Sequence, residues 1–583
     1  MPDAHGGAGG AETGEAGPGD RSQEAGPGDR SHGPGDRSQE AGPGDRSHGP
    51  GDRSQEAGPG DRSHVPGDRS TGGGLWLAGL AGLLLFAFPY AEQTRNANER
   101  PRLLQALALV DTGTFAIDGP GARGLAAGPD VARDPVRGAL YPNKPPGASL
   151  VAALAYAGAR GLAEASGEPL TLRRFTWWAR LLAGVVPTLL LCGWLARRLA
   201  PELGGRAAWL GLGVYALATP AFAYAHLLYG HQLTACLLAL GAFAIVDGCR
   251  GDRPLRAALG GLLAGAAVGV EYSAAFCGPP LAVFVLLSAR RGRWRAGLAA
   301  ALGAAVPLAL LAVYHAAAFG GPLRTGYHHV VDPGFAAKHG QGLLGLVAPS
   351  WTAFHAHVVA SAGGLLWWAP LAVVALAGLW DMSRAPCDSP LRSHARVQLA
   401  MFAALTLACS SLNFEGGWRV GPRYLVAALP ALALGWAYAL PRLTRRAPGL
   451  ALVVALLTWS VVINGLAGDL WPHFDLTNVH QPVSEVLLPL WQGGWTPYTP
   501  GGLGVTGAVL AGLLGLLWLL RPTGRARAAA TVLGVAVGLG MVAATRLIAP
   551  HPRGAANLAY IERVWEPPAD GAAPSAILGS LPR

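Results

Sequence analysis

The stretch GLALVVALLTWSVVINGLA, residues 449–467, is apolar almost throughout and contains no charged side chain. Similar stretches of about 17–23 residues recur along the chain, and about 20 such residues cross the hydrocarbon core of a bilayer as one helix. The full sequence of 583 residues is 51% hydrophobic and only 14% charged. A soluble chain would instead show amphipathic periods of about 3.6 or 2 residues. The sequence therefore predicts an all-α integral membrane protein.

The apolar stretches predict about thirteen membrane-spanning helices. They lie near residues 74–90, 176–196, 207–229, 232–248, 257–275, 277–289, 296–318, 361–380, 397–412, 424–440, 449–467, 502–520 and 528–548. A large loop separates the first two spans. It contains one further apolar stretch, residues 148–163, which we do not count as a span for a topological reason.

Clusters of arginine decide which face of the membrane each loop occupies. They fall within Arg197–Arg206, Arg250–Arg256, Arg290–Arg295, Arg384–Arg396, Arg442–Arg446 and Arg521–Arg527. If residues 148–163 form a juxtamembrane helix in the interface, all these clusters share one face with the N-terminus, and the positive-inside rule makes that face cytoplasmic. The C-terminus then lies outside. The long loops 91–175, 319–360, 413–423 and 468–501 gather on the outer face, which indicates a working surface there.

The sequence divides into three parts. Residues 1–72 repeat Gly-Asp-Arg-Ser and contain too little apolar surface to fold, so we expect a disordered cytoplasmic tail. Residues 73–550 form the membrane domain, and residues 551–583 form a short outward-facing tail. The Arg-rich, Lys-poor composition is typical of a high-GC bacterium and predicts the bacterial inner membrane. The net charge of +10 follows the positive-inside rule, so we expect no nucleic-acid partner.

A carboxylate flanked by arginines follows the first predicted span, in the stretch Asn96-Ala97-Asn98-Glu99-Arg100-Pro101-Arg102. Glu99 is a candidate general base because neighbouring cations favour the ionised form of a carboxylate. Asn98 and Arg100 are candidate substrate-binding residues beside it. The alternative is a solvated loop carboxylate that pairs with an arginine. Further acidic residues of the same loop, Asp111, Asp118, Asp130 and Asp134, could assist Glu99 or serve as turn and cap residues.

The second motif of this loop is Tyr141-Pro142-Asn143-Lys144-Pro145-Pro146-Gly147. Lys144 is one of only two lysines among 45 basic residues. The two prolines that follow it limit the freedom of the backbone, which prepositions an ammonium near the headgroup level for pairing with a phosphate. Lys144 is therefore a candidate substrate-binding residue. A lysine that only extends its charge to the interface is the alternative.

Two further candidates for substrate binding lie outside the first loop. Glu271 falls inside a predicted apolar helix, and intramembrane carboxylates usually face a cavity or a partner. A hydrogen bond to a neighbouring helix is the alternative for Glu271. Arg423 belongs to the Gly-rich outer loop 413–424, whose backbone and guanidinium groups suit phosphate recognition. A tight turn with interfacial Trp and Arg is the alternative there. The histidines and cysteines show no clean metal-site spacing.

Together these motifs resemble the GT-C superfamily of polytopic membrane glycosyltransferases, which includes protein O-mannosyltransferases and the aminoarabinose transferase that acts on lipid A. The similarity lies in the acidic motif after the first helix, in the Lys-Pro-Pro element before a juxtamembrane helix, and in the loop Gly-Gly-x-x-x-Gly-Pro-Arg-Tyr at residues 416–424. It extends from residue 74 to roughly residue 550. The family's acidic motif is often two carboxylates, whereas this chain has Asn98-Glu99.

The resemblance implies a glycosyltransferase that passes a sugar from a polyprenyl-phosphate carrier to an acceptor on the non-cytoplasmic side. It implies that Glu99 activates the acceptor hydroxyl, while Lys144 and Arg423 neutralise the departing lipid phosphate. The expected partners are the lipid-linked sugar donor and the membrane. The Asn98-Glu99 variant argues against a metal at that position, although a divalent cation elsewhere stays open as a cofactor. The sequence specifies neither the sugar nor the acceptor.

Two other classes of protein stay open at this point. A transporter or flippase of a lipid-linked or anionic substrate would show internal repeats and charges deep in the bilayer, whereas the candidate charges here gather at one surface. A non-catalytic membrane scaffold would tolerate the replacement of Glu99 and Lys144 without loss of function.

Overall fold

The computed structural model describes residues 72–87, 97–119, 125, 127–414, 417–474, 477–495, 504–565 and 578. These residues belong to one compact unit, Asp68–Arg583. The predicted repeat tail, residues 1–72, lies outside the described residues apart from its last position.

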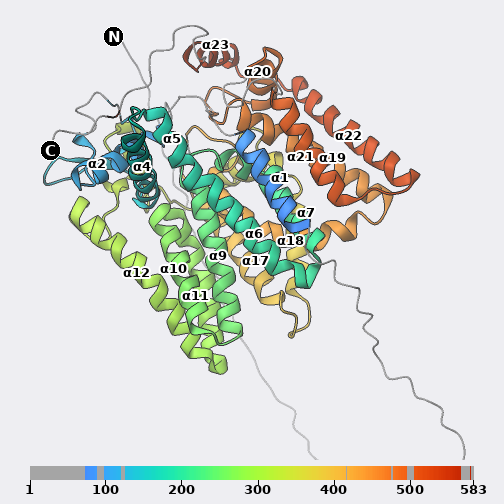
Figure 1. Cartoon of the computed structure of the whole chain (residues 1–583), viewed down its shortest axis with the longest axis horizontal. Coiled ribbons are helices and arrows are strands. Elements are labelled where there is room, and N and C mark those ends of the chain that lie inside the picture. The colour runs from blue at the N-terminus through green and yellow to red at the C-terminus, as the bar shows by residue number, and fades with distance from the viewer. Residues whose placement is uncertain are drawn as a thin grey trace, which may run out of the picture. The chain divides into compact units, whose positions relative to one another are not determined.

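The described residues form mostly helices, as the sequence predicts (Figure 1). In the first half they are α1 (Gly72–Phe86), α2 (Arg100–Thr112), α4 (Gly147–Ser166), α5 (Leu172–Arg180), η1 (Leu181–Val185), α6 (Val186–Leu203), α7 (Gly205–Leu217), α8 (Ala221–Tyr224), α9 (His231–Arg250), α10 (Pro254–Val270), η2 (Tyr272–Cys277), α11 (Gly278–Ser288), η3 (Ala289–Arg293) and α12 (Trp294–Phe319).

The second half continues with helices of more uneven length. They are η4 (Gly326–His329), α13 (Pro333–His339), α14 (Trp351–Phe354), η5 (His355–Val359), α15 (Leu365–Trp368), α16 (Ala372–Ser383), α17 (Arg392–Ser410), η6 (Arg423–Ala428), α18 (Leu429–Leu443), α19 (Ala447–Asp469), η7 (Val483–Leu487), α20 (Leu488–Gln492), α21 (Gly504–Leu520), α22 (Arg525–Ala544), η8 (Thr545–Leu547) and α23 (Gly554–Trp565).

Six helical segments of the described residues are long and apolar enough to cross a membrane, and four shorter apolar helices accompany them. The predicted count of about thirteen spans stays a prediction. The apolar stretch 449–467 forms α19, which begins just after the extended residue Arg446 with a proline in its first turn, the position where proline fits a helix. The helices pack closely where glycines face a neighbouring backbone. A Cβ at Gly211 of α7, for example, would lie 2.3 Å from the carbonyl oxygen of Ala433 in α18.

Three predicted single spans are wrong because the helix breaks within each of them. In 207–229, α7 ends at Leu217, and a short helix α8 begins only after Pro220. In 361–380, Pro370 separates α15 from α16, and residues that precede a proline avoid helical dihedrals. In 257–275, α10 ends at Val270 and Glu271 is extended, with φ −144° and ψ 126°. Glu271 therefore lies at the end of an apolar helix and not inside it.

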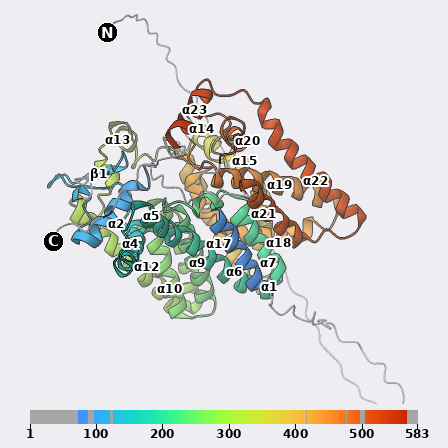
Figure 2. The ribbon, with the colours of Figure 1, turned by 45° about the horizontal axis from the view of Figure 1, so that its top comes forward.

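The segment predicted to form the first outer loop, residues 91–175, contains helices and a small sheet where the structure describes it. The predicted juxtamembrane helix 148–163 is confirmed as a helix, α4, and it packs against α2 and α5 (Figure 2). One side of α4 is exposed at Leu150, Leu154 and Leu162, and its buried residues are Ala148, Ser149, Ala152, Ala155, Tyr156 and Ala159. Exposed leucines on one side suit a helix that lies against a bilayer, although its depth in the membrane stays a prediction.

Two elements depart from the predicted architecture. A two-stranded antiparallel sheet, β1 (Val131–Arg133) with β2 (Leu140–Pro142), adds strands to a fold predicted to be all-α. Its register pairs Ala132 with Tyr141 and leads the chain directly into the Lys-Pro-Pro motif. The predicted short tail 551–583 contains a helix, α23, and residues 566–577 lie outside the described part of the chain.

Candidate functional site

Glu99 lies at the start of α2 and is fully buried. Its carboxylate accepts two hydrogen bonds from the Arg180 guanidinium, from Nε to Oε1 at 2.8 Å and from Nη2 to Oε2 at 2.7 Å. The backbone N–H of Leu228 donates a third hydrogen bond to Oε1 at 2.8 Å. A bidentate pair of this kind is geometrically specific and strong. Glu99 therefore ties the first outer loop to the beginning of a membrane-spanning helix and to the turn before α9.

The pKa of Glu99 reflects these contacts. Burial by itself raises the pKa of a carboxyl group, but the charge and hydrogen bonds of Arg180, together with the Leu228 N–H, hold the pKa of Glu99 below its ordinary value. His473 contributes in the same direction, and its Nδ1 lies 3.0 Å from the Tyr229 hydroxyl. Glu99 is therefore ionised at neutral pH, as a general base must be, while its lone pairs are largely engaged.

Asn98 and Glu271 meet through Arg102. One guanidinium nitrogen of Arg102 donates to the backbone and side-chain oxygens of Asn98, at 2.7 and 2.5 Å, and the other donates to Oε1 of Glu271 at 2.5 Å. All three side chains are buried. Arg100, the first residue of α2, is only partly buried. The arginine that joins the first outer loop to Glu271 is thus Arg102, which the sequence analysis did not single out.

Lys144 extends from the Lys-Pro-Pro motif toward Tyr327 in the loop after α12. Its Nζ donates to the Tyr327 hydroxyl at 2.7 Å and lies 4.6 Å from the ring centroid. The motif fits this place because Gly147 touches the end of α10: a Cβ at Gly147 would lie 2.6 Å from the carbonyl oxygen of Gly269. Close packing at Gly147 therefore brings the lysine beside the residue that follows α10, Glu271.

Arg423 begins the short helix η6 and is buried. Its Nη2 donates to the Tyr424 hydroxyl at 3.0 Å, and the guanidinium lies 5.0 Å from the centroid of that ring. Its Nε is buried without a hydrogen-bond partner among the residues that the structure describes. A buried cationic donor without a partner is costly, so Arg423 suits an anionic ligand at this point.

An apolar cavity of about 290 Å³ opens beside these groups. Glu271, Tyr327 and Tyr424 supply its polar side, so the partners of Arg102, Lys144 and Arg423 all line it. The rest of the lining is largely apolar and includes Phe276, Leu343, Leu344, Leu346, Leu405, Ala408, Leu412 and Phe414. An elongated apolar ligand with one charged end matches this distribution.

The charges around the cavity do not balance. Lys144 and Arg423 interact electrostatically with both Glu271 and Asp130, and Arg102 pairs with Glu271. Three cations therefore face two carboxylates among these groups, so positive charge predominates. The negative charge of a phosphodiester would complement it.

The sequence analysis missed several members of this site. Tyr327 and Tyr424 connect the two cations to the cavity, but no sequence pattern predicts that two tyrosines almost a hundred positions apart meet. Arg180 was detectable, because an arginine within a predicted apolar span usually has a partner. Among the described residues, no group of three or more histidine, cysteine, aspartate or glutamate side chains is arranged to hold a metal ion.

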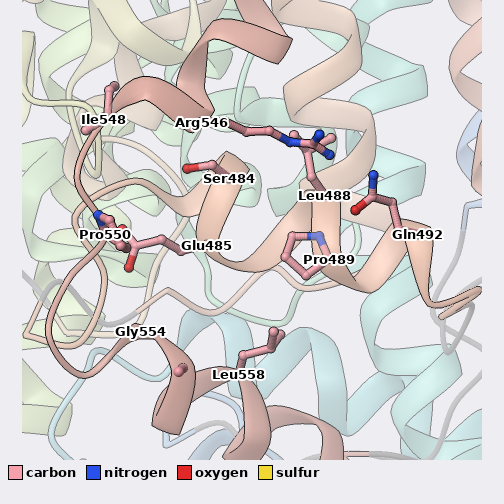
Figure 3. Close-up of a pocket in the computed structure, with 11 residues that line it drawn as sticks. Ser484, Glu485, Leu488, Pro489, Gln492, Arg546, Ile548, Pro550, Gly554 and Leu558 are labelled. Atoms are coloured by element: carbon pink, nitrogen blue, oxygen red, sulfur yellow. The ribbon is translucent and has the colours of Figure 1, made fainter.

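A second cavity, of about 350 Å³, lies between three elements (Figure 3): the helix η7, the segment that follows α22, and the helix α23. Its acidic residue Glu485 accepts hydrogen bonds from the backbone N–H groups of His480, Gln481 and His551, at 3.0, 2.6 and 2.9 Å. Glu485 thus attaches the C-terminal segment to η7. The cavity shares no lining residue with the apolar cavity beside Lys144, so we assign it a structural role.

Comparisons with known proteins give fold neighbours only. No family model and no curated protein matches the sequence. The structure is similar to ArnT from Cupriavidus metallidurans bound to undecaprenyl phosphate, at 17% identity over 81% of this chain and 78% of that chain, with a TM-score of 0.42. The apo state of the same ArnT matches at 17% identity over 80% and 77%, with a TM-score of 0.40.

The arabinosyltransferase EmbB from Mycobacterium smegmatis matches at 13% identity over 85% of this chain and 42% of that chain, with a TM-score of 0.40. Because these TM-scores are low, the function has to be argued from the residues of this chain.

Proposed function

We propose that this protein is a GT-C-type membrane glycosyltransferase that transfers a sugar from a polyprenyl-phosphate carrier to an acceptor on the non-cytoplasmic side of a bacterial inner membrane. The observation that carries the proposal is the cluster of buried cations at the polar side of an apolar cavity, with Lys144 and Arg423 reaching it through Tyr327 and Tyr424. A lipid-linked phosphate has both features that this arrangement matches, an apolar chain and a single anionic group.

The cations supply what the leaving group needs. When the acceptor oxygen forms a bond to the anomeric carbon, the bond from that carbon to the phosphate oxygen breaks, and negative charge develops on the lipid phosphate. Preorganised cations at this point stabilise the transition state without reorganising. The excess positive charge shared by Arg102, Lys144 and Arg423 supports this role, since it is present before the substrate binds.

The proton of the acceptor hydroxyl must pass to a base, and two carboxylates are candidates. Glu99 is the candidate from the motif, and its depressed pKa supports an ionised form. Glu271 borders the cavity, which supports its presence near the reacting groups. We propose that Glu99 positions the first outer loop through Arg180, whether or not it also takes the proton, and that Glu271 faces the substrate.

The proposal is tested by replacing each of the two lysines in turn. Lys144→Met should abolish protection of the purified protein against heat by undecaprenyl phosphate, and it should reduce sugar transfer from radiolabelled polyprenyl-phosphate donors about 100-fold or more. Lys338 in α13 is exposed and provides the matched control, because Lys338→Met should change neither readout.

Two results would contradict the proposal. One is binding of undecaprenyl phosphate that is indifferent to Lys144→Met. The other is a native protein that binds the carrier but transfers no sugar from any donor of a broad panel; this would favour a transporter or flippase of the lipid-linked substrate.

A further inference from the structure

A cavity of about 670 Å³ lies at a different place from the candidate site. It opens where the beginnings of α7 and α22 meet the ends of α18 and α21. Four arginines line it: Arg206, Arg445, Arg521 and Arg527. We call it the basic cavity. It belongs to the face that carries the arginine clusters, which the positive-inside rule assigns to the cytoplasm.

The arginines of the basic cavity repel one another without an acidic counterpart. Among the described residues that line the cavity, no carboxylate is present. Arg206 donates to the backbone carbonyl of Leu519 at 2.6 Å, and Arg527 donates to that of Arg445 at 3.3 Å. Burial lowers the pKa of Arg206, and the like charges of Arg521 and Arg527 lower it further. The basic cavity therefore concentrates positive charge that would favour the binding of an anion.

Hydrogen-bond donors also remain available in this cavity. The first turn of α7 lines it, and Gly204 before that turn offers no side chain to cap the helix. The N-terminal N–H groups of a helix favour anions. The Nε of Arg527 is buried and has no partner within the described ranges of the chain. Positive charge and unused donors thus coincide in one cavity.

Arginines that only follow the positive-inside rule have different surroundings. Arg290, Arg291 and Arg293 in η3 connect α11 to α12 on the same face, and η3 contains no buried residue. Arg290 and Arg291 are exposed, so water can solvate their guanidinium groups. In the basic cavity Arg445 and Arg521 are exposed too, but Arg206 and Arg527 are partly buried and line the same cavity with them. Topology alone does not explain four arginines gathered around one cavity.

We propose that the basic cavity is a binding site for a phosphate-bearing anion, either the headgroup of an anionic membrane lipid or a free polyphosphate. Basic pockets between helices on the cytoplasmic side commonly bind anionic headgroups. Guanidinium groups suit phosphate because they donate paired hydrogen bonds in a fixed plane. The site is separate from the candidate transfer site and does not depend on the proposed function.

The test measures the apparent melting temperature of the full chain in uncharged detergent against three additives: phosphatidylglycerol, phosphatidylcholine and inorganic pyrophosphate. We expect phosphatidylglycerol or pyrophosphate to raise the melting temperature by several degrees. A rise with phosphatidylglycerol alone identifies a lipid headgroup site, and a rise with pyrophosphate identifies a free polyphosphate site. An equal rise with phosphatidylcholine, or no rise with either anion, would overturn the proposal.

Gly205→Asp provides the decisive variant. A Cβ at Gly205 meets no other atom within 4 Å, and its backbone suits any residue, so a carboxylate should enter the cavity without strain and occupy the place of the anion. The response to the anion should disappear in Gly205→Asp and persist in the neutral control Gly205→Asn.

Two further controls separate this site from others. The response should survive in the double variant Arg290→Gln/Arg291→Gln, which removes exposed charges from the same face. It should also survive in Lys144→Met, which removes a cation from the candidate transfer site. Loss of the response in either control, or an unchanged response in Gly205→Asp, would refute the assignment to the basic cavity, whatever the outcome for sugar transfer.

Discussion

Replacing Glu99 with glutamine should lower the stability of the protein, separately from any effect on catalysis. The substitution keeps the size of the side chain but removes the charge that Arg180 faces. Arg180 is only 1% exposed, and it lies 81 positions away from Glu99 in the sequence. After the substitution its guanidinium would lose the bidentate carboxylate that it faces.

The expected magnitude follows from this burial. Breaking a buried ion pair by removing one partner typically costs about 3–5 kcal/mol, because the remaining charge is left uncompensated in a poorly solvating environment. The Leu228 N–H also loses a charged acceptor. An exposed pair on the same helix gives the matched comparison: Arg174 in α5 pairs with Glu168, and both side chains are about half exposed. Removing that pair should cost about 0–1 kcal/mol.

The assay compares apparent melting temperatures in detergent for Glu99→Gln, Glu168→Gln and the double variant Glu99→Gln/Arg180→Gln. We expect a large fall for Glu99→Gln, little change for Glu168→Gln, and recovery of most of the loss in the double variant, since it removes both buried charges. Equal melting temperatures for Glu99→Gln and the native protein would refute the argument from the buried pair.

The double variant also separates the two roles proposed for Glu99. If Glu99 only positions the first outer loop, sugar transfer should return together with stability when both charges are removed. If Glu99 is the general base, the double variant should be folded, should bind undecaprenyl phosphate, and should remain inactive. Glu271→Gln in the same assays reports on the carboxylate that borders the cavity.

Three further predictions concern pH, the apolar cavity and the Lys-Pro-Pro-Gly motif. Because the folded pKa of Glu99 lies below its ordinary value of 4.5, the contribution of Glu99 to stability should be complete above about pH 4.5 and should disappear as the pH falls through the depressed pKa. The difference in melting temperature between the native protein and Glu99→Gln should therefore shrink over that range. A constant difference would contradict this prediction. Ala408→Trp should fill part of the 290 Å³ cavity and weaken the thermal protection by undecaprenyl phosphate. The melting temperature without ligand should stay nearly unchanged. Undiminished protection would argue against this cavity as the binding site of undecaprenyl phosphate. Gly147→Ala should lower the free energy of unfolding by about 1–3 kcal/mol through overpacking, because the added Cβ would lie 2.6 Å from the Gly269 carbonyl oxygen. Gly158→Ala lies in the same helix α4, where an added Cβ meets open space. This control should therefore be tolerated in the same thermal assay.

Apolar length predicts the helices of this protein well where nothing interrupts them. The run 449–467 became α19, and the stretch that the positive-inside argument excluded from the spans became α4. The prediction fails at Pro220, Pro370 and Glu271, where apolar composition continues but the helix stops. Composition averaged over a span does not resolve a break of two or three residues. A proline inside a predicted span marks a place where the helix can end, but it does not decide the matter, since α12 continues through Pro307.

The residues of the candidate site fall into two groups. A local sequence pattern predicts the first group, and only the folded structure reveals the second. Lys144, Glu271 and Arg423 could be proposed from charge near or within apolar stretches, and Asn98 from its place beside Glu99. Lys144 and Arg423 bind tyrosines that line the same cavity as Glu271. Their partners could not be proposed, because the contacts join segments that are distant in the sequence. Arg102 reaches Glu271 across 169 positions, and Lys144 reaches Tyr327 across 183.

The arrangement of charge gives a physical reason why these long-range contacts form in a membrane protein. A buried cation is costly unless a partner neutralises it, so Arg180 and Arg102 each draw the first outer loop onto the membrane helices through Glu99 and Glu271. Beyond these two pairs, the hydrogen bonds that Lys144 and Arg423 donate to side chains of the described residues go to tyrosine hydroxyls. The protein thus uses its strongest ion pairs to fix the loop and leaves two weakly paired cations at the cavity, where an incoming phosphate can provide the missing charge.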